Sequence, residues 1–164
     1  MSDPSSDRPG FELALRLLLG FRTLIDDLHA ELARQGHPDV RPVHGFVLQA
    51  IGSDGATAAE LGRRLGVSKQ AAGKHVEALE RLGYLERAAD ARDARRRAVR
   101  LTARGADCLA RSARILEALR RRWADALGED RLRALEDDLG TMAPGTPWRL
   151  DTPGWLGGAD RRAR

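Results

Sequence analysis

Apolar residues recur three, four or seven positions apart along most of this chain, a spacing that predicts amphipathic helices. The first such stretch covers 11–35 and ends at a Gly-His-Pro sequence that begins with Gly36. The second starts at Pro42, a residue that suits the first turn of a helix, and stops at the Gly-Ser-Asp-Gly sequence 52–55. The chain therefore opens with one long helix and one short helix.

Two further short helical patterns follow, separated by a Gly-Val pair. Thr57 and Glu60 form the Thr-x-x-Glu capping box that fixes the start of the first one, over 58–65. Ser68 caps the second one, which ends near Gly83, a residue suited to a left-handed stop. Two short amphipathic helices joined by a tight turn are the layout of a helix-turn-helix.

A strand pattern comes directly after the helix-turn-helix. Segments 84–88 and 98–102 read as short strands, and an arginine-rich turn joins them. Between positions 81 and 104, eight arginines stand against three acidic residues, so this segment has a net charge of +5 while the whole chain has +4. We therefore predict a two-stranded wing, with the positive field of the chain focused on it.

The C-terminal half returns to helical spacing over 103–127 and 129–142. The longer of these helices carries a seam with alternating steps of four and three: Leu109, Ala113, Leu116, Arg120, Trp123 and Leu127. Such a seam favours a partner helix. The predicted fold class is mainly α with a small β-wing, a winged helix-turn-helix between long N- and C-terminal helices.

Length and composition fit one soluble helical domain, since the 164 residues are 42% hydrophobic and 32% charged. The longest apolar run is interrupted by Arg16 and is too short for a bilayer, and the N-terminus lacks the basic flank of a signal peptide, so we expect a cytoplasmic protein without membrane contact. The expected division has three parts: a flexible start (1–10), one domain (11–142) and a mobile tail (143–164). Within the domain we expect a DNA-binding lobe at about 43–102 and dimerisation helices at about 11–35 and 103–142. The role of Trp148 and Trp155 in that tail stays open.

The order of these elements resembles the multiple-antibiotic-resistance regulator (MarR) family of winged-helix transcription factors. The resemblance covers about 11–142 and rests on the passages 60–68 and 79–87 and on Asp93-x-Arg95, which stands six residues before Leu101-Thr102. It implies a homodimer that binds a pseudo-palindromic operator in double-stranded DNA. It also implies repression that a small molecule relieves.

The N-terminal part of a recognition helix meets the base edges of the major groove. We therefore predict DNA contacts from Ser68, Lys69, Gln70, Ala71, Lys74 and His75. Gln70 has the amide that can read adenine bidentately, and Lys69 or Lys74 can reach a guanine or a phosphate. Similar proteins commonly have arginine at the position of Lys74. Lysine lacks the planar guanidinium group, so it cannot form the bidentate hydrogen bonds that arginine forms there. Gly73 indicates either that the helix backbone approaches DNA closely at this position or that the helix simply tolerates a glycine there.

In the wing, the resemblance implies that Arg95 enters the minor groove and that Asp93 holds the shape of the wing through a salt bridge. Arg92, Arg96 and Arg97 would neutralise phosphates, which contributes affinity and salt dependence but little sequence information.

The resemblance also implies an effector pocket between the dimer helices and the DNA-binding lobe, lined by parts of the first two helices and the start of the fifth. Candidates for an aromatic or anionic effector are His29, His44, Phe46, Arg16, Arg22 and Trp123. No spacing singles out any of them.

Two alternative chemistries involve the cysteine and the histidines. Cys108 is the single cysteine; Arg104 and Arg111 could lower its pKa and make it redox-active, but a core-facing thiol is favoured. The four histidines have no zinc spacing and no cysteine pair, so we expect neither a metal nor a cofactor.

Enzymatic function is not indicated, because no glycine-rich phosphate loop or nucleophile constellation is present and neighbouring acidic pairs such as Asp26-Asp27 do not face each other on a helix. The competing interpretation is a winged-helix protein-interaction module whose basic wing binds an acidic protein surface.

Overall fold

The computed structural model describes residues 9–52, 54–89 and 97–143. In chain order its elements are α1 (Gly10–Arg34), α2 (Pro42–Ile51), β1 (Ala56–Thr57), α3 (Ala58–Leu65), α4 (Lys69–Arg81), β2 (Leu85–Ala89), β3 (Arg97–Leu101), α5 (Ala103–Leu127) and α6 (Glu129–Met142). The predicted class, mainly α with a small β-wing, is confirmed, and the helix bounds agree with the sequence prediction to within about a residue.

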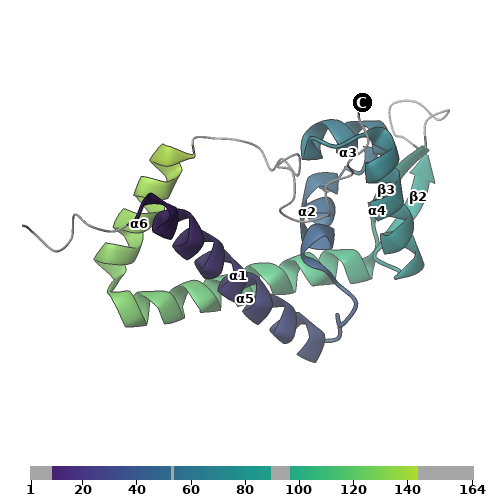
Figure 1. Ribbon diagram of the computed structural model, residues 1–164. Helices are drawn as coiled ribbons and strands as arrows, with labels where there is room; N and C mark the ends of the chain where they lie inside the picture. The colour runs from purple at the N-terminus through teal and green to yellow at the C-terminus, as the bar shows by residue number, and fades with distance from the viewer. Residues whose placement is uncertain (1–8, 53, 90–96, 144–164) are drawn as a thin grey trace, which may run out of the picture.

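The molecule has two parts that meet along α5 (Figure 1). The winged-helix lobe contains α2, α3, α4 and the sheet, gathered at the N-terminal end of α5. The helical arm contains α1, the rest of α5 and α6, with α1 packed against α5. The connection between α1 and α2 and the start of α5 therefore link the two parts.

The sheet has three antiparallel strands in the order β1-β3-β2, whereas the sequence predicts only two. The two wing strands pair with Leu85 opposite Leu101, and the short β1 pairs on the other side of β3 with Ala56 opposite Val99. Gly55 permits this approach, because a Cβ there would lie 2.7 Å from the carbonyl oxygen of Val99. A two-residue strand has no alternation, so the pattern could not predict it.

One core joins the two parts. Its fully buried side chains come from the C-terminal half of α1, from α2 to α4, from the start of β2 and from α5: Leu32, Val47, Leu48, Ile51, Leu61, Leu65, Leu79, Tyr84 and Cys108. Leu15 and Leu18, which the sequence places on the same apolar face as Leu32, are instead exposed, because the N-terminal half of α1 extends beyond this core.

Helix α5 presents two apolar stripes. Its core-facing stripe is Cys108, Ile115 and Leu119, all buried. The seam that the sequence singles out is the other stripe, on which Leu116 and Leu127 are exposed and Trp123 is half-buried. The predicted seam therefore faces the core of its own chain only at Leu109, and its C-terminal part does not. Among the described residues, no helix has both the length and the apolar character needed to cross a membrane.

Candidate nucleic-acid interface

The recognition helix α4 is held at its start by local hydrogen bonds, as the sequence predicts. The hydroxyl of Ser68 accepts the N–H of Ala71 at 3.1 Å. One helix earlier, the hydroxyl of Thr57 accepts the N–H of Glu60 at 3.2 Å while the Glu60 carboxylate accepts the N–H of Thr57 at 2.8 Å. The capping box and the cap fix where α3 and α4 begin, and so they fix the angle of the turn between the two helices.

Helix α4 buries one face and exposes the other. Ala72, Val76 and Leu79 point into the core. Of the predicted DNA-contacting residues, the exposed ones are Ser68, Lys69, Gln70 and Lys74, and the half-buried ones are Ala71 and His75. The structure thus brings the predicted residues together on the first two turns, with three long polar side chains in solvent. Burial lowers the pKa of His75, and a lowered pKa favours the neutral ring. A neutral ring can donate one hydrogen bond and accept another.

The tip of the wing lies outside the described residues. This applies to Arg92, Asp93, Arg95 and Arg96, and also to the side chain of Arg97, whose backbone begins β3.

Two of the arginines that give this segment its positive charge have acidic partners at the base of the wing. Arg100 pairs with Glu86 at 2.7 Å across the two strands, and Arg87 pairs with Glu80 of α4 at 2.9 Å. The net charge of +5 already includes Glu86 but not Glu80, so only the pair with Glu80 lowers the positive charge of the segment further. Both arginines are exposed, so each ion pair contributes little to stability. The Arg87–Glu80 pair joins the wing to α4, and the Arg100–Glu86 pair joins the two strands.

A buried polar network, which the sequence analysis missed, connects the lobe to the arm. His37, only 3% exposed, lies in the α1–α2 connection between two partners. Its Nδ1 is 3.1 Å from the hydroxyl of Tyr84, which follows α4, and its Nε2 is 3.0 Å from the carboxylate of Asp107 in α5. These residues are 47 and 70 positions from His37 in the chain, so no local pattern could have linked them.

Each hydrogen bond of this network can be assigned a donor and an acceptor. An ionised Asp107 accepts, so Nε2 of His37 donates to it and the Tyr84 hydroxyl donates to Nδ1. Arg104 completes the set by donating to the Tyr84 oxygen at 3.1 Å. Arg111, the larger influence, and then His37 lower the pKa of Asp107, while burial raises the pKa of the Tyr84 hydroxyl. We call His37, Tyr84, Arg104, Asp107 and Arg111 the junction network.

The comparisons with known proteins agree with this geometry. The MarR family model matches residues 39–96, from the start of the winged-helix lobe into the wing. The winged-helix part of the chain is therefore similar to MarR-family proteins. No curated protein matches it.

Solved structures share the fold over most of their length. FabT from Streptococcus pneumoniae, solved in complex with DNA, has a TM-score of 0.70 at 19% identity over 82% of this chain and 95% of its own. PcaV from Streptomyces coelicolor, a transcriptional regulator solved with its natural ligand, has a TM-score of 0.58 at 22% identity over 87% and 96%. The transcriptional regulator Tm0710 from Thermotoga maritima has a TM-score of 0.55 at 25% identity over 81% and 91%.

The single cysteine of the chain faces the core. Cys108 is buried, and burial, the largest influence, raises the pKa of its thiol. The lowering that Arg104 exerts is smaller than the effect of burial. The prediction of a core-facing thiol is therefore confirmed. A protonated, inaccessible thiol is not reactive.

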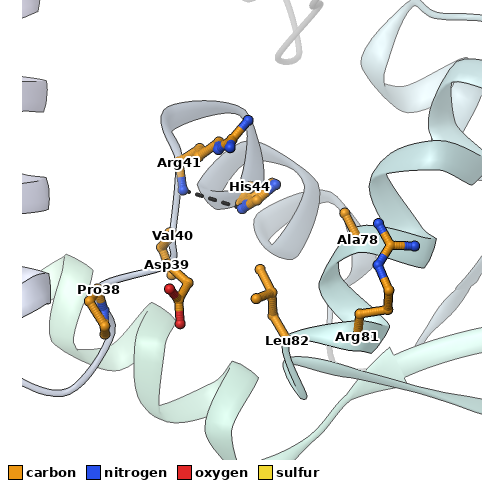
Figure 2. A pocket seen from close by; sticks show the side chains of 8 residues that line it. All are labelled: Pro38, Asp39, Val40, Arg41, His44, Ala78, Arg81 and Leu82. Carbon is orange, nitrogen blue, oxygen red and sulfur yellow. Dashed lines mark hydrogen bonds between the residues drawn. The ribbon is translucent and has the colours of Figure 1, made fainter.

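The predicted effector residues do not line one cavity. His44, at the first turn of α2, lines a cavity of about 490 Å³ beneath the C-terminal end of α4 (Figure 2). Trp123 lines a groove of about 400 Å³ between α5 and α6. Arg16 pairs with Glu12 and Arg22 with Asp26 on the surface of α1, and Phe46 is half-buried in α2.

His29 has a different environment from the other candidates. Its Nδ1 lies 2.8 Å from the carbonyl oxygen of Ile25, so Nδ1 carries the hydrogen. Its Nε2 is buried without a hydrogen-bond partner. Among the residues that the structure describes, no three histidine, cysteine or acidic side chains gather in a way that would hold a metal ion.

Proposed function

We propose that the chain is a DNA-binding transcriptional regulator that acts as a homodimer on a pseudo-palindromic operator. The observation that carries the proposal is the exposed polar face of α4, with Lys69, Gln70 and Lys74 in solvent, within a MarR-family winged helix. FabT, which shares this fold, was solved with DNA, and so was a MepR variant from S. aureus. The same placement of a recognition helix supports DNA binding here.

The proposed mode uses both grooves. The first turns of α4 enter the major groove, where Gln70 reads a base and Lys69 and Lys74 contact guanines or phosphates. Arg95 enters the adjacent minor groove, and Asp93 orients the wing. Arg92, Arg96 and Arg97 neutralise phosphates, so these three arginines supply affinity rather than sequence preference.

The exposed apolar residues of the helical arm support a homodimer. Leu13 is 65% exposed and Leu19 is 53% exposed in α1, and Met142 at the end of α6 is 82% exposed. Several large apolar side chains exposed on the same helices are costly in water, and such exposure supports an interface. A second copy that packs its own arm against α1, α5 and α6 would cover these side chains and set the distance between the two recognition helices.

The regulatory direction that we propose is repression relieved by a small molecule. PcaV, of similar fold, was solved with its natural ligand. In a dimer, a ligand that changes the separation of the two recognition helices would weaken binding to successive major grooves, which are about 34 Å apart.

The test is a selection of bound sequences from a random duplex library by the purified protein at physiological salt. We expect enrichment of an inverted repeat whose half-sites are one helical turn apart. Salt-sensitive binding without an enriched sequence would contradict the proposal and favour the protein-interaction module, because such a module has only weak, sequence-blind affinity for DNA.

A further inference from the structure

Tyr84 fastens the end of the recognition helix to the rest of the molecule. It lies in the turn between α4 and β2, and its N–H donates to the carbonyl of Leu79 in α4 at 2.9 Å. Its side chain is fully buried. Because Tyr84 is hydrogen-bonded to the last turns of α4, the contacts that hold Tyr84 also hold the end of this helix.

The main chain of Tyr84 is held by α5. Its carbonyl oxygen accepts the N–H of Thr102, the N-cap residue of α5, at 3.1 Å. The same oxygen lies so close to Gly105 that a Cβ there would overlap it. These contacts fix the end of α4 relative to the first turn of α5.

The hydroxyl of Tyr84 makes the connection to α1. It donates to Nδ1 of His37 at 3.1 Å, and the centres of the two rings are 5.6 Å apart. His37 is in turn held by α1, since its N–H donates to the carbonyl of Leu32 at 2.9 Å. The Tyr84–His37 hydrogen bond therefore joins the end of α4 to the end of α1, a helix of the arm.

Two arginines of α5 hold the two ends of this connection. Arg104 donates to the Tyr84 oxygen at 3.1 Å, and its guanidinium carbon lies 4.7 Å from the centre of the ring. Arg111 donates to the carboxylate of Asp107 at 2.7 Å and to the side-chain oxygen of Gln35, the C-cap residue of α1, at 3.3 Å. The Tyr84 hydroxyl thus belongs to a set of hydrogen bonds that reaches α1, α4 and α5.

We propose that Tyr84 is a positioning residue for DNA recognition, which sets the angle of the recognition helix relative to the helical arm through its hydroxyl and His37. Tyr84 is buried, so it acts through α4 and not by contact with DNA. This role rests on the proposed function: in a homodimer joined through the arms, the angle of each lobe determines which spacing of half-sites both recognition helices can reach.

Removal of the hydroxyl leaves a buried ring nitrogen without its donor. His37 is only 3% exposed, and a buried polar group without a hydrogen-bond partner is costly. A rotation of the lobe that admits water to His37 relieves this cost. We therefore expect Tyr84→Phe to sample a wider range of lobe angles, while the apolar core that joins the two parts keeps the variant folded.

The first experiment measures the arrangement of lobe and arm without DNA. Nitroxide labels at Thr23→Cys in α1 and Glu77→Cys in α4 occupy exposed positions outside the junction network, and the native Cys108 is buried. Labelled protein is mixed with an excess of unlabelled protein, so that double electron–electron resonance reports distances within one chain. We expect a narrow distance distribution with Tyr84 and a broader one with Tyr84→Phe.

The controls separate positioning from stability. Ser112→Ala removes a hydroxyl of α5 outside the network and should keep the narrow distribution. His37→Leu breaks the same connection from the other side and should broaden the distribution as Tyr84→Phe does. Superimposable distributions of the parent and both network variants overturn the proposal, whatever stability the variants lose.

The second experiment relates the lobe angle to DNA. The duplexes carry two copies of the selected half-site, with the spacer between them lengthened or shortened one base pair at a time. We expect the parent to prefer one spacer, and Tyr84→Phe to lose about tenfold of this preference, the effect of one lost buried hydrogen bond, with unchanged affinity for a single half-site. An equal loss of affinity for every spacer would show a merely structural role and overturn the proposal.

The two experiments distinguish failure of this inference from failure of the proposed function. If no duplex is enriched, the proposed function fails, and the distance distributions alone decide whether Tyr84 sets the lobe angle. If a duplex is enriched and Tyr84→Phe keeps both the distribution and the spacer preference of the parent, the regulator stands and the positioning role fails.

Discussion

At the scale of single residues, the junction network is the feature of this chain whose hydrogen bonds depend most closely on one another. His37, Tyr84 and Asp107 come from the α1–α2 connection, the turn between α4 and β2 and the start of α5, and every hydrogen bond among them has a consistent donor and acceptor. His37 and Tyr84 are buried, and a buried polar group is costly when it loses its hydrogen-bond partner. Removing one group should therefore cost more than the loss of one average hydrogen bond.

Tyr84→Phe tests this expectation with little change in shape. It removes the donor to His37 and the acceptor for Arg104, and we expect a loss of about 1–2 kcal/mol in the free energy of unfolding. Ser112→Ala is the matched control, because that hydroxyl donates to the carbonyl of Cys108 one turn earlier and is not a member of the junction network. Urea denaturation at one fixed protein concentration measures both. An equal, small effect of the two substitutions would show that the network does not stabilise the junction.

Asp107 should make stability depend on pH in the acid range. Arg111 and then His37 lower its pKa in the folded protein, so its contribution is complete above the pKa of the unfolded chain, about 3.9, and is lost as the pH falls through the lower folded value. The melting temperature of the wild type should therefore fall more steeply on acidification below about pH 5 than that of Asp107→Asn. Parallel melting curves of the two proteins over this range would contradict the assignment.

At the scale of elements, local signals predicted the helices well. Thr57, Glu60 and Ser68 determine helix starts through bonds to residues three positions away, so their geometry is readable from spacing alone. The exposed face of α4 follows in the same way from its 3.6-residue period.

Features that depend on distant contacts were not predictable. The strand β1 is too short for a pattern, and the junction network joins residues far apart in the chain. The apolar spacing of α1 gave no sign that its two halves have different neighbours, with the core beside Leu32 and none beside Leu15. The cavity between α2 and α4 likewise depends on packing, so of the proposed effector residues only His44 lies there.

The docking of α5 onto the lobe depends on one glycine. A Cβ at Gly105 would overlap the carbonyl oxygen of Tyr84, whereas a Cβ at Gly140 in α6 would meet nothing within 4 Å. We expect Gly105→Ala to destabilise the protein by about 2 kcal/mol or more. Gly140→Ala should instead be neutral or stabilising by up to about 1 kcal/mol. Thermal denaturation of both variants checks this, and a tolerated alanine at position 105 would contradict the close approach.

At the scale of the whole molecule, the helical arm and the winged-helix lobe have complementary tasks. The arm exposes apolar residues that a second copy can cover, and the lobe exposes polar residues that suit DNA. The junction network lies where the two parts meet.

The homodimer itself is testable with substitutions in the arm. Leu13→Glu combined with Leu19→Glu places two charges on exposed apolar positions of α1 outside the core of the chain. We expect sedimentation to show a dimer for the wild type and a folded monomer for the double variant. Gln49→Glu, a charge added on the exposed surface of α2, should remain dimeric. A wild type that sediments as a monomer at micromolar concentration would refute the proposed interface.

The central claim is that this protein reads DNA sequence, and the most direct measurement is the ratio of its affinities for the selected duplex and for a scrambled duplex of equal length and composition. At physiological salt we predict a ratio of at least about a thousand. We also predict that Gln70→Ala lowers the affinity for the selected duplex more than the affinity for the scrambled duplex, so that the ratio falls. A ratio near one across a range of salt concentrations would contradict sequence-specific regulation and leave only a basic, sequence-blind surface.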